Sequence, residues 1–277
     1  MALTKERIAE LTELCRVFRI DTLKSIQAIQ SGHPGGSLSV CEILTLLYQE
    51  KMNVSPETAE DKNRDLLVLS KGHAAPMLYR NLIEKGFLPK NSMDSLRRID
   101  SILQGHPSNH CPGVEIPSGP LGIGLSAAQG MALGRRLDGS NARVYAILGD
   151  GELNEGCIWE AVMSAPKFKL DNLCVIVDYN KVQLDGTTDQ IMPLLDLSAK
   201  FKAFGWNVIE CENGNDIEKL DKAFDEAESF KGLPSVIIAN TIKGKGVSFM
   251  EGQASWHGSP IPMEKLELAL KELGGEN

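Results

Sequence analysis

The sequence predicts an α/β protein with a doubly wound, mostly parallel sheet and helices on both faces. Two observations predict this class: short apolar runs are continuous rather than alternating, and helical segments separate them. Continuous apolar runs are typical of strands buried on both faces of a parallel sheet, with connecting helices as the cover. The 277 residues contain no repeat or linker that would divide them, so we expect residues 1–277 to form a single domain.

The first expected element is an amphipathic helix over residues 4–30, which has apolar residues at helical spacing and stops before Gly32. Five apolar runs then predict strands at 66–69, 144–148, 173–177, 208–209 and 236–239. Further helices are expected at 75–85, 126–137, 153–167, 216–230 and 263–273. Asn215 is the expected N-cap of helix 216–230.

Composition and charge exclude several functional classes. The 29 basic and 37 acidic residues give a net charge of −8, which disfavours a nucleic-acid or anionic membrane surface. No apolar run is long enough to cross a bilayer and the N-terminus lacks a signal-peptide region, so we expect a cytoplasmic protein. The six cysteines include no CxxC pair, and they are expected to be reduced, packed thiols.

Polar and glycine-rich segments follow four of the expected strands. In a doubly wound sheet the ligand lies beyond the carboxyl ends of the strands, so these segments are where a site is expected. They are Ser70-Lys71-Gly72-His73, Gly149-Asp150-Gly151-Glu152, Asp178-Tyr179-Asn180 and residues 240–246.

The strongest of these patterns joins Gly149-Asp150-Gly151 to Asn180 after the next strand. Mg²⁺ prefers six oxygen ligands, and Asp150, Asn180 and the Val182 carbonyl would supply three of them. The glycines permit a tight turn, and the helix that follows would direct its N-terminus at phosphate groups. An ordinary strand–turn–helix with an aspartate cap is the alternative for Gly-Asp-Gly alone. The full spacing favours a diphosphate held through a metal.

Four of the five histidines are flanked by glycine in expected loops. Glycine allows close approach of a ligand, and imidazole can donate to phosphate or exchange a proton near neutral pH. Binding of a metal by these histidines is a weaker alternative, because none has the two-histidine spacing of a metal-binding helix. We expect an ordinary role for His110. The four candidates are His33, His73, His106 and His257.

A dinucleotide-binding pattern also occurs in the segment that starts at Gly122 and contains Gly124. That fingerprint requires a strand immediately before its first glycine. Pro117 and Pro120 make the preceding segment a poor central strand, so a nicotinamide enzyme is disfavoured.

Taken together, the motifs resemble the N-terminal, pyrophosphate-binding region of transketolases over almost the whole chain. The first residue of the family's frequent asparagine pair is Tyr179 here, a position at which transketolases tolerate change. The motifs that carry the resemblance are Ser31-Gly32-His33-Pro34-Gly35, Ser70-Lys71-Gly72-His73, Gly105-His106-Pro107, Pro112-Gly113-Val114-Glu115, Gly119-Pro120-Leu121-Gly122, Gly149-Asp150-Gly151-Glu152, Asn180-Lys181 and Ser255-Trp256-His257-Gly258.

The resemblance implies that thiamine diphosphate is bound through Mg²⁺, or through Mn²⁺ or Ca²⁺ in its place. Glu155 is implied to be an interface carboxylate that passes protons between two active sites. Lys243 either joins the site or is a solvated loop lysine. The implied metal ligands are Asp150, Asn180 and Val182; the implied cofactor contacts are His73, Gly119, Leu121, Gly151, Glu155, Asn180 and Lys243; and His33, His106 and His257 would surround the substrate.

The activity implied is transfer of a two-carbon ketol unit from a ketose or ketose phosphate to an aldose or aldose phosphate. No second half of a transketolase follows in the sequence, so the resemblance implies a companion chain with the C-terminal, pyrimidine-binding domain, in an α₂β₂ heterotetramer. The alternatives are the α subunit of a 2-oxo acid dehydrogenase, a synthase of the deoxyxylulose phosphate type and a non-catalytic cofactor-binding module. The choice among pentose phosphates, branched sugars and sulfonated sugars stays open.

Overall fold

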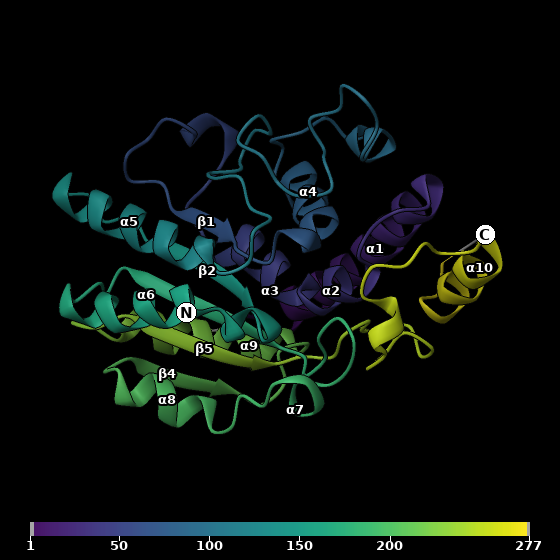
Figure 1. Ribbon diagram of the computed structural model, residues 1–277. Helices are drawn as coiled ribbons and strands as arrows, with labels where there is room; N and C mark the ends of the chain where they lie inside the picture. The colour runs from purple at the N-terminus through teal and green to yellow at the C-terminus, as the bar shows by residue number, and fades with distance from the viewer. Residues whose placement is uncertain (1–2, 276–277) are drawn as a thin grey trace.

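A computed structural model describes residues 3–275, in which a five-stranded parallel sheet carries helices on both faces (Figure 1). The strand order is β1-β2-β3-β5-β4, so the chain reaches the edge at β4 and returns to place β5 beside β3. This confirms the predicted α/β class. The strands are β1 (Leu66–Leu69), β2 (Val144–Gly149), β3 (Leu173–Tyr179), β4 (Asn207–Cys211) and β5 (Ser235–Asn240).

The helices lie between and around these strands in the order expected for an α/β chain. No helix within residues 3–275 is long and apolar enough to span a membrane. The α-helices are α1 (Lys5–Ile29), α2 (Pro34–Ser39), α3 (Cys41–Leu46), α4 (Ala75–Glu84), α5 (Ile123–Leu137), α6 (Gly156–Lys167), α7 (Thr188–Ile191), α8 (Leu197–Ala203), α9 (Ile217–Ser229) and α10 (Met263–Glu272).

The strand register brings the predicted polar segments to one edge of the sheet. Gly149 of β2 pairs with Asp178 of β3, and Tyr179 of β3 pairs with Asn240 of β5. Because all pairs are parallel, the segments that follow these strands leave the sheet on the same side. In Figure 1 this is the side toward which the strand arrows point, where the yellow-green segment after β5 also runs.

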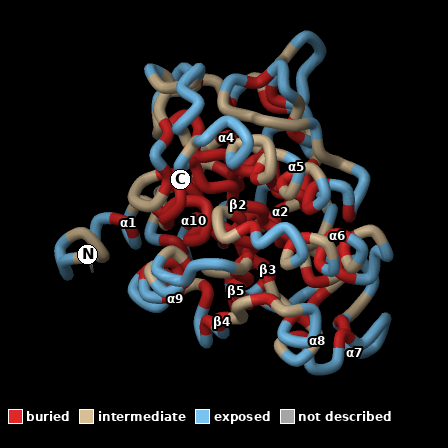
Figure 2. The backbone as a smooth tube through the Cα atoms, turned by 90° about the vertical axis from the view of Figure 1, so that its left-hand side faces the viewer, coloured by how far each residue is buried: buried red, intermediate tan, exposed pale blue. Residues whose placement is uncertain are grey.

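Both faces of the sheet are buried, as continuous apolar runs require. Alternate residues of β2 face opposite cores: Tyr145 and Ile147 belong to the core that includes residues of α1, α3, α4, α9 and α10, whereas Val144 and Ala146 belong to the core that includes residues of α5, α6 and α8. Figure 2 shows the buried residues concentrated along the strands and the inner helices, with exposed residues in the outer loops. Two cores therefore hold a sheet that has no solvent-facing side.

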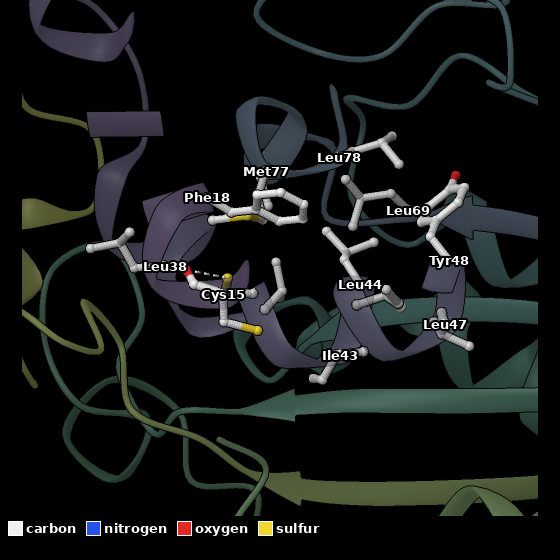
Figure 3. Packing of buried hydrophobic residues seen from close by; sticks show 14 of the residues in the cluster. Cys15, Phe18, Leu38, Ile43, Leu44, Leu47, Tyr48, Leu69, Met77 and Leu78 are labelled. Atoms are coloured by element: carbon white, nitrogen blue, oxygen red, sulfur yellow. Dashed lines mark hydrogen bonds between the residues drawn. The ribbon is translucent and has the colours of Figure 1, made fainter. Parts of the chain in front are cut away.

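Helix α1 anchors the first core. Its N-cap Thr4 accepts a hydrogen bond from the Arg7 amide, and Gln30 closes it in the left-handed conformation with φ 51°. Its buried face includes Phe18, which lies beside Met77 of α4 in Figure 3. All six cysteines are free thiols, as predicted.

Two short helices between Gly32 and β1 were not predicted from the sequence. Glycines and a proline at the start of α2 suggest a loop, yet Gly35 and Gly36 are buried inside it. A Cβ added at Gly35 would lie 2.8 Å from the Trp256 carbonyl oxygen, so the glycine serves close packing rather than a break in the helix.

Three expected helix starts were wrong. Asp216, not Asn215, caps α9, because its carboxylate accepts from the Lys219 amide, while Asn215 bonds the Ser39 carbonyl and Glu42 instead. Helix α5 begins three residues early, since Gly122 enters it with a positive φ of 92° that glycine tolerates. Helix α6 begins at Gly156, after a separate 3₁₀ turn at Gly151–Asn154.

Candidate functional site

A cleft of about 490 Å³ lies at the carboxyl edge of the sheet, and almost every predicted site residue lines it. This volume suits a cofactor-sized ligand. Further residues that had no role predicted from the sequence also line it, among them Lys71, Glu152 and Gln183. The predicted residues that the cleft brings together are His33, His73, His106, Gly119, Leu121, Asp150, Gly151, Asn180, Val182, Lys243 and His257.

The four candidate histidines form one cluster although they are spread over more than 220 positions of the chain. The ring centroids of His33 and His73 are 5.2 Å apart, and those of His73 and His257 are 5.0 Å apart. His33 also lies 5.5 Å from His257 and 6.0 Å from His106. His110 is exposed and does not line the cleft. The prediction that four histidines, and not the fifth, share a site is therefore geometrically consistent.

The histidines of the cluster are neutral at physiological pH. Burial, reinforced by neighbouring cations, lowers the pKa of His33 to about 4 and that of His257 to about 3. Burial followed by the Lys71 charge lowers the pKa of His73, and burial followed by Arg97 lowers that of His106. Neutral imidazoles can accept a proton or donate one hydrogen bond each, as proton exchange with a substrate requires.

Beneath the histidines lies a buried ion pair between Lys71 and Asp178, which are 2% and 0% exposed. Asp178 also accepts hydrogen bonds from Ser39 Oγ at 2.6 Å and from Thr241. Burial alone would raise the pKa of Asp178, but the Lys71 ammonium and these hydrogen bonds outweigh it and lower the pKa. The pair therefore fixes a charged network at the ends of β1, β3 and β5.

The pKa of Asp150 shifts in the opposite direction to that of Asp178, although Asp150 is also buried, at 3% exposure. Its carboxylate accepts hydrogen bonds from the amides of Gly151, at 2.7 Å, and Lys181. Burial and the charge of Asp178 together raise the pKa of Asp150 to about 7. A carboxylate without a cationic side-chain partner in direct contact is a group that a bound cation would stabilise.

Asn180 and Val182 lie in a short loop that is closed by its own hydrogen bonds. The Asn180 Oδ1 accepts from the Val182 amide at 3.1 Å, and Asn180 Nδ2 donates to Asp178. Val182 forms an isolated antiparallel bridge with Thr187, and the Gln183 amide donates to the Gly186 carbonyl at 2.8 Å. The loop also contacts Asp150, because the Lys181 amide donates to the Asp150 carboxylate.

Lys243 is 2% exposed, so of the two alternatives for this residue the solvated loop lysine is wrong. Its ammonium donates to the Val182 and Gln183 carbonyls at 3.0 and 2.9 Å, and it lies 2.9 Å from Nδ1 of His257. Burial, followed by the charge of Lys71, lowers the pKa of Lys243 to about 8. Lys243 thus joins the loop that carries Asn180 and Val182 to the histidine cluster.

Glu152 explains the glycine pattern that resembles a dinucleotide fingerprint. Its carboxylate accepts from the Gly122 and Gly149 amides, at 2.8 and 3.0 Å, and from the Ser70 hydroxyl. A Cβ on Gly124 would lie 2.3 Å from Ser70 Oγ, so α5 can pack against this network only through glycine. Burial raises the pKa of Glu152.

Glu155 lies outside the cleft, in contrast to the other predicted residues. It is exposed at the N-cap position of α6, where its side chain makes no capping hydrogen bond. Its side chain borders Gly122, behind the loop that carries Gly119 and Leu121. The role at an interface therefore stays a prediction, and no contact of Glu155 with the cleft is present within the described part of this chain.

The donor set of the cleft fits a hard dication better than a histidine-bound metal. Residues 3–275 contain no group of three or more His, Cys, Asp or Glu side chains arranged to hold a metal. Asp150, Asn180 and Val182 instead line the same cleft and offer carboxylate, amide and carbonyl oxygens, which are the ligands that Mg²⁺ prefers. A dication here would also favour the ionised form of Asp150 against the burial that raises its pKa.

Comparison with known proteins agrees with this geometry. Residues 9–277 match the family described as the thiamine diphosphate binding domain of transketolase. The chain belongs to this transketolase family. It is 42% identical over 272 residues to the 6-deoxy-6-sulfo-D-fructose transketolase subunit SqwG of Clostridium sp. strain MSTE9, with 98% of each chain covered.

A further relative and a solved structure that resemble the chain are also named as transketolases. The chain is 41% identical over 244 residues to an apulose-4-phosphate transketolase subunit of Phocaeicola vulgatus, covering 88% of this chain and 86% of the relative. It is similar to the solved transketolase from Leishmania mexicana with a TM-score of 0.89 and 30% identity. That alignment covers 100% of this chain and 42% of the Leishmania chain. The predicted transketolase fold and family are thereby confirmed.

Proposed function

We propose that the chain is the thiamine diphosphate-binding subunit of a two-chain transketolase, a transferase that moves a two-carbon ketol unit between sugars. The observation that carries the proposal is the single cleft in which the glycine-framed Asp150, the Asn180 loop and four histidines converge. The family match disfavours the α subunit of a 2-oxo acid dehydrogenase. A non-catalytic module is disfavoured because buried charges such as those of the Lys71–Asp178 pair are costly to retain without a use.

In this proposal Asp150, Asn180 and the Val182 carbonyl hold Mg²⁺, or Mn²⁺ or Ca²⁺, against the diphosphate. His73, Gly151 and Lys243 would contact the phosphate oxygens, and Gly119 and Leu121 would meet the aminopyrimidine. When bound, thiamine diphosphate supplies the nucleophilic carbon and the electron sink that ketol transfer needs. The protein contributes orientation, a desolvated site and placed protons.

When Lys243 is charged, its hydrogen bond to His257 determines which ring nitrogen of His257 carries the proton. An ammonium has donors and no acceptor, so Lys243 Nζ donates to His257 Nδ1. A neutral His257 then holds its own proton on Nε2, the nitrogen that remains free to donate to a substrate hydroxyl. His33 and His106 are also neutral by the effects of burial and can accept hydroxyl protons.

The proposal requires a companion chain that supplies the pyrimidine-binding domain, in an α₂β₂ assembly with Glu155 at an interface. It is supported by relatives of matching length that are named as transketolase subunits. Both of those names describe sugars that bear an anionic group, which favours sugar phosphates or sulfonated sugars as the substrate class. A cytoplasmic location is part of the same proposal.

The decisive experiment is to purify the chain alone and together with a candidate companion chain, and to assay ketol transfer with thiamine diphosphate and Mg²⁺. We expect turnover by the pair and none by the single chain. Ketol transfer by the single chain would overturn the two-chain proposal. In the active pair, His106→Ala should lower kcat about a hundredfold while cofactor affinity is retained, whereas the exposed His110→Ala should be neutral. Loss of cofactor affinity with unchanged kcat would show that His106 has another role.

A further inference from the structure

A second pocket lies at the amino edge of the sheet, opposite the cleft, and has no assigned role. Its volume is about 410 Å³, which is within the range of small-molecule sites. The pocket is built where the three central strands begin. Arg143 immediately precedes β2, Asn172 immediately precedes β3, and Lys231 lies in the segment between α9 and β5.

This amino-edge pocket is basic although the whole chain is acidic. Four cationic side chains and one carboxylate line it, whereas the chain has a net charge of −8. The carboxylate belongs to Asp171 and accepts a hydrogen bond from the Gly232 amide at 3.0 Å. None of the four cations forms an ion pair within residues 3–275. Because like charges repel, such a cluster favours the binding of an anion. The cations are Arg136, Arg143, Lys169 and Lys231.

The burial of Arg143 is the observation that points to a ligand. Its side chain lines the pocket and is 9% exposed, and Nε has no hydrogen-bond partner in the described part of the chain. Nη2 donates to the Ala227 carbonyl at 3.3 Å, a long contact with a neutral group. Arg19 is similarly buried but pairs with Glu42. A buried guanidinium without a carboxylate is costly to maintain, and a bound anion would stabilise it.

The exposed cations around Arg143 are positioned by backbone contacts and retain donors for a ligand. Arg136 Nη1 donates to the Phe168 and Lys169 carbonyls, at 2.6 and 2.8 Å. A guanidinium has five N–H donors, so most of those of Arg136 stay available. Lys231 donates to the Glu228 carbonyl at 2.8 Å and has two further ammonium donors. The cations can therefore converge on one anion without breaking their present contacts.

We propose that the amino-edge pocket binds a small molecule that carries a phosphate or diphosphate group, at a site separate from the cleft. Guanidinium groups match phosphate oxygens through paired N–H donors, and ammonium groups add compact positive charge. The pocket volume suits a small molecule. The acidic net charge disfavours a nucleic acid, which requires an extended basic face. The inference goes beyond the proposed ketol transfer and does not depend on it.

Calorimetric titration of the full chain with inorganic pyrophosphate tests the pocket. EDTA is included because it removes the dication through which the cleft is proposed to hold a diphosphate. We expect the unmodified chain to bind pyrophosphate, and more tightly than inorganic phosphate, which carries less charge. Lys169→Gln should weaken the binding about tenfold, since one charge-assisted contact is lost. Absence of pyrophosphate binding by the unmodified chain, or equal affinity of Lys169→Gln, would overturn the inference.

Arg143→Met separates ligand binding from a structural role. It should abolish pyrophosphate binding and leave the Tm of the unliganded chain equal or higher, because a buried charge without a partner is removed. Unchanged pyrophosphate affinity in this variant would contradict the proposed site, whatever its Tm. If Arg143→Met does not fold, Lys169→Gln and Arg136→Gln carry the test, because both change exposed side chains.

Lys90 provides the matched control. It is an exposed lysine in a different pocket of about 470 Å³, where three carboxylates balance three cations. Lys90→Gln should leave the pyrophosphate affinity unchanged. A tenfold loss in this variant too would show a response to the overall charge of the chain, and would overturn the inference. Double-stranded DNA that binds more tightly than pyrophosphate, and is lost in Lys169→Gln, would contradict a small-molecule ligand.

Discussion

The two edges of the parallel sheet differ in how much charge they bury. At the amino edge, Arg136, Lys169 and Lys231 are exposed around a shallow pocket, and the buried charged residues are Asp65 and Arg143, where the Asp65 carboxylate accepts from the Arg143 and Asn53 amides. At the carboxyl edge, five charged residues are almost fully buried: Lys71, Asp150, Glu152, Asp178 and Lys243. Surface charges contribute little to stability, whereas buried charges are stable only with partners. The difference identifies the carboxyl edge as the part of the fold shaped by cofactor binding.

The largest expected effect comes from breaking the buried pair at the carboxyl edge. Lys71→Met leaves Asp178 charged and without its cation in a dry environment, and should lower the free energy of unfolding by about 3–5 kcal/mol. Urea denaturation at pH 7.5 measures this. Adding Asp178→Asn removes the unpaired charge and should restore much of the loss. If the double variant is as unstable as the single one, the ion pair is not the reason for the instability.

Asp150 should matter for the cofactor rather than for the fold. Asp150→Ala in the assembled enzyme should weaken Mg²⁺-dependent thiamine diphosphate binding by at least about a hundredfold, because a ligand of the metal is lost. Titration followed by calorimetry measures the affinity. Asp171→Ala at the amino edge, where the carboxylate accepts from the Gly232 amide, should leave the affinity unchanged. Unchanged affinity in Asp150→Ala would remove Asp150 from the metal site.

The histidine cluster should make the cofactor-free chain sensitive to acid. Burial keeps the pKa of His33 at about 4, below the ordinary value of 6.5, so the unfolded chain binds the proton more readily. The stabilisation is complete above pH 6.5 and is lost as the pH falls toward 4. After allowance for solvent screening, we expect His33 to account for a loss of about 1 kcal/mol between pH 6.5 and 5.

Denaturation curves across this pH range test that expectation. His33→Asn should flatten the pH dependence of the unfolding free energy, because one depressed pKa is removed. His110→Asn, a change at an exposed histidine outside the cleft, should leave the slope as it is. Equal slopes for the unmodified chain and His33→Asn would show that the cluster does not control acid stability.

The smallest effect is expected at the amino edge. Lys231 is exposed and its ammonium bonds the nearby Glu228 carbonyl, a local contact that water can replace. Lys231→Met should change the free energy of unfolding by less than about 0.5 kcal/mol and leave cofactor affinity intact. A loss comparable with that of Lys71→Met would abolish the distinction between the two edges.

Sequence alone was sufficient for features that local patterns determine. Continuous apolar runs predicted the strands, and glycines beside Asp150 and the four histidines pointed to residues that converge in the cleft. Pairings over long sequence separation were not predictable: Lys71 and Asp178 are 107 positions apart. Helix α2 was missed because its buried glycines look like helix breakers when the packing against Trp256 is unknown. Lys243 was ambiguous for the same reason, since burial decides between a solvated and a functional lysine.

The self-closed loop that carries Asn180 and Val182 has a thermodynamic consequence. Its Val182–Thr187 bridge, the hydrogen bond from the Thr188 amide to the Lys181 carbonyl and the Thr187 capping box order the backbone without any ligand. Ordering a residue costs about 1–2 kcal/mol of conformational entropy. This chain meets that cost when it folds, so the proposed metal and diphosphate would encounter a preorganised receptor and would retain more of their contact energy as affinity.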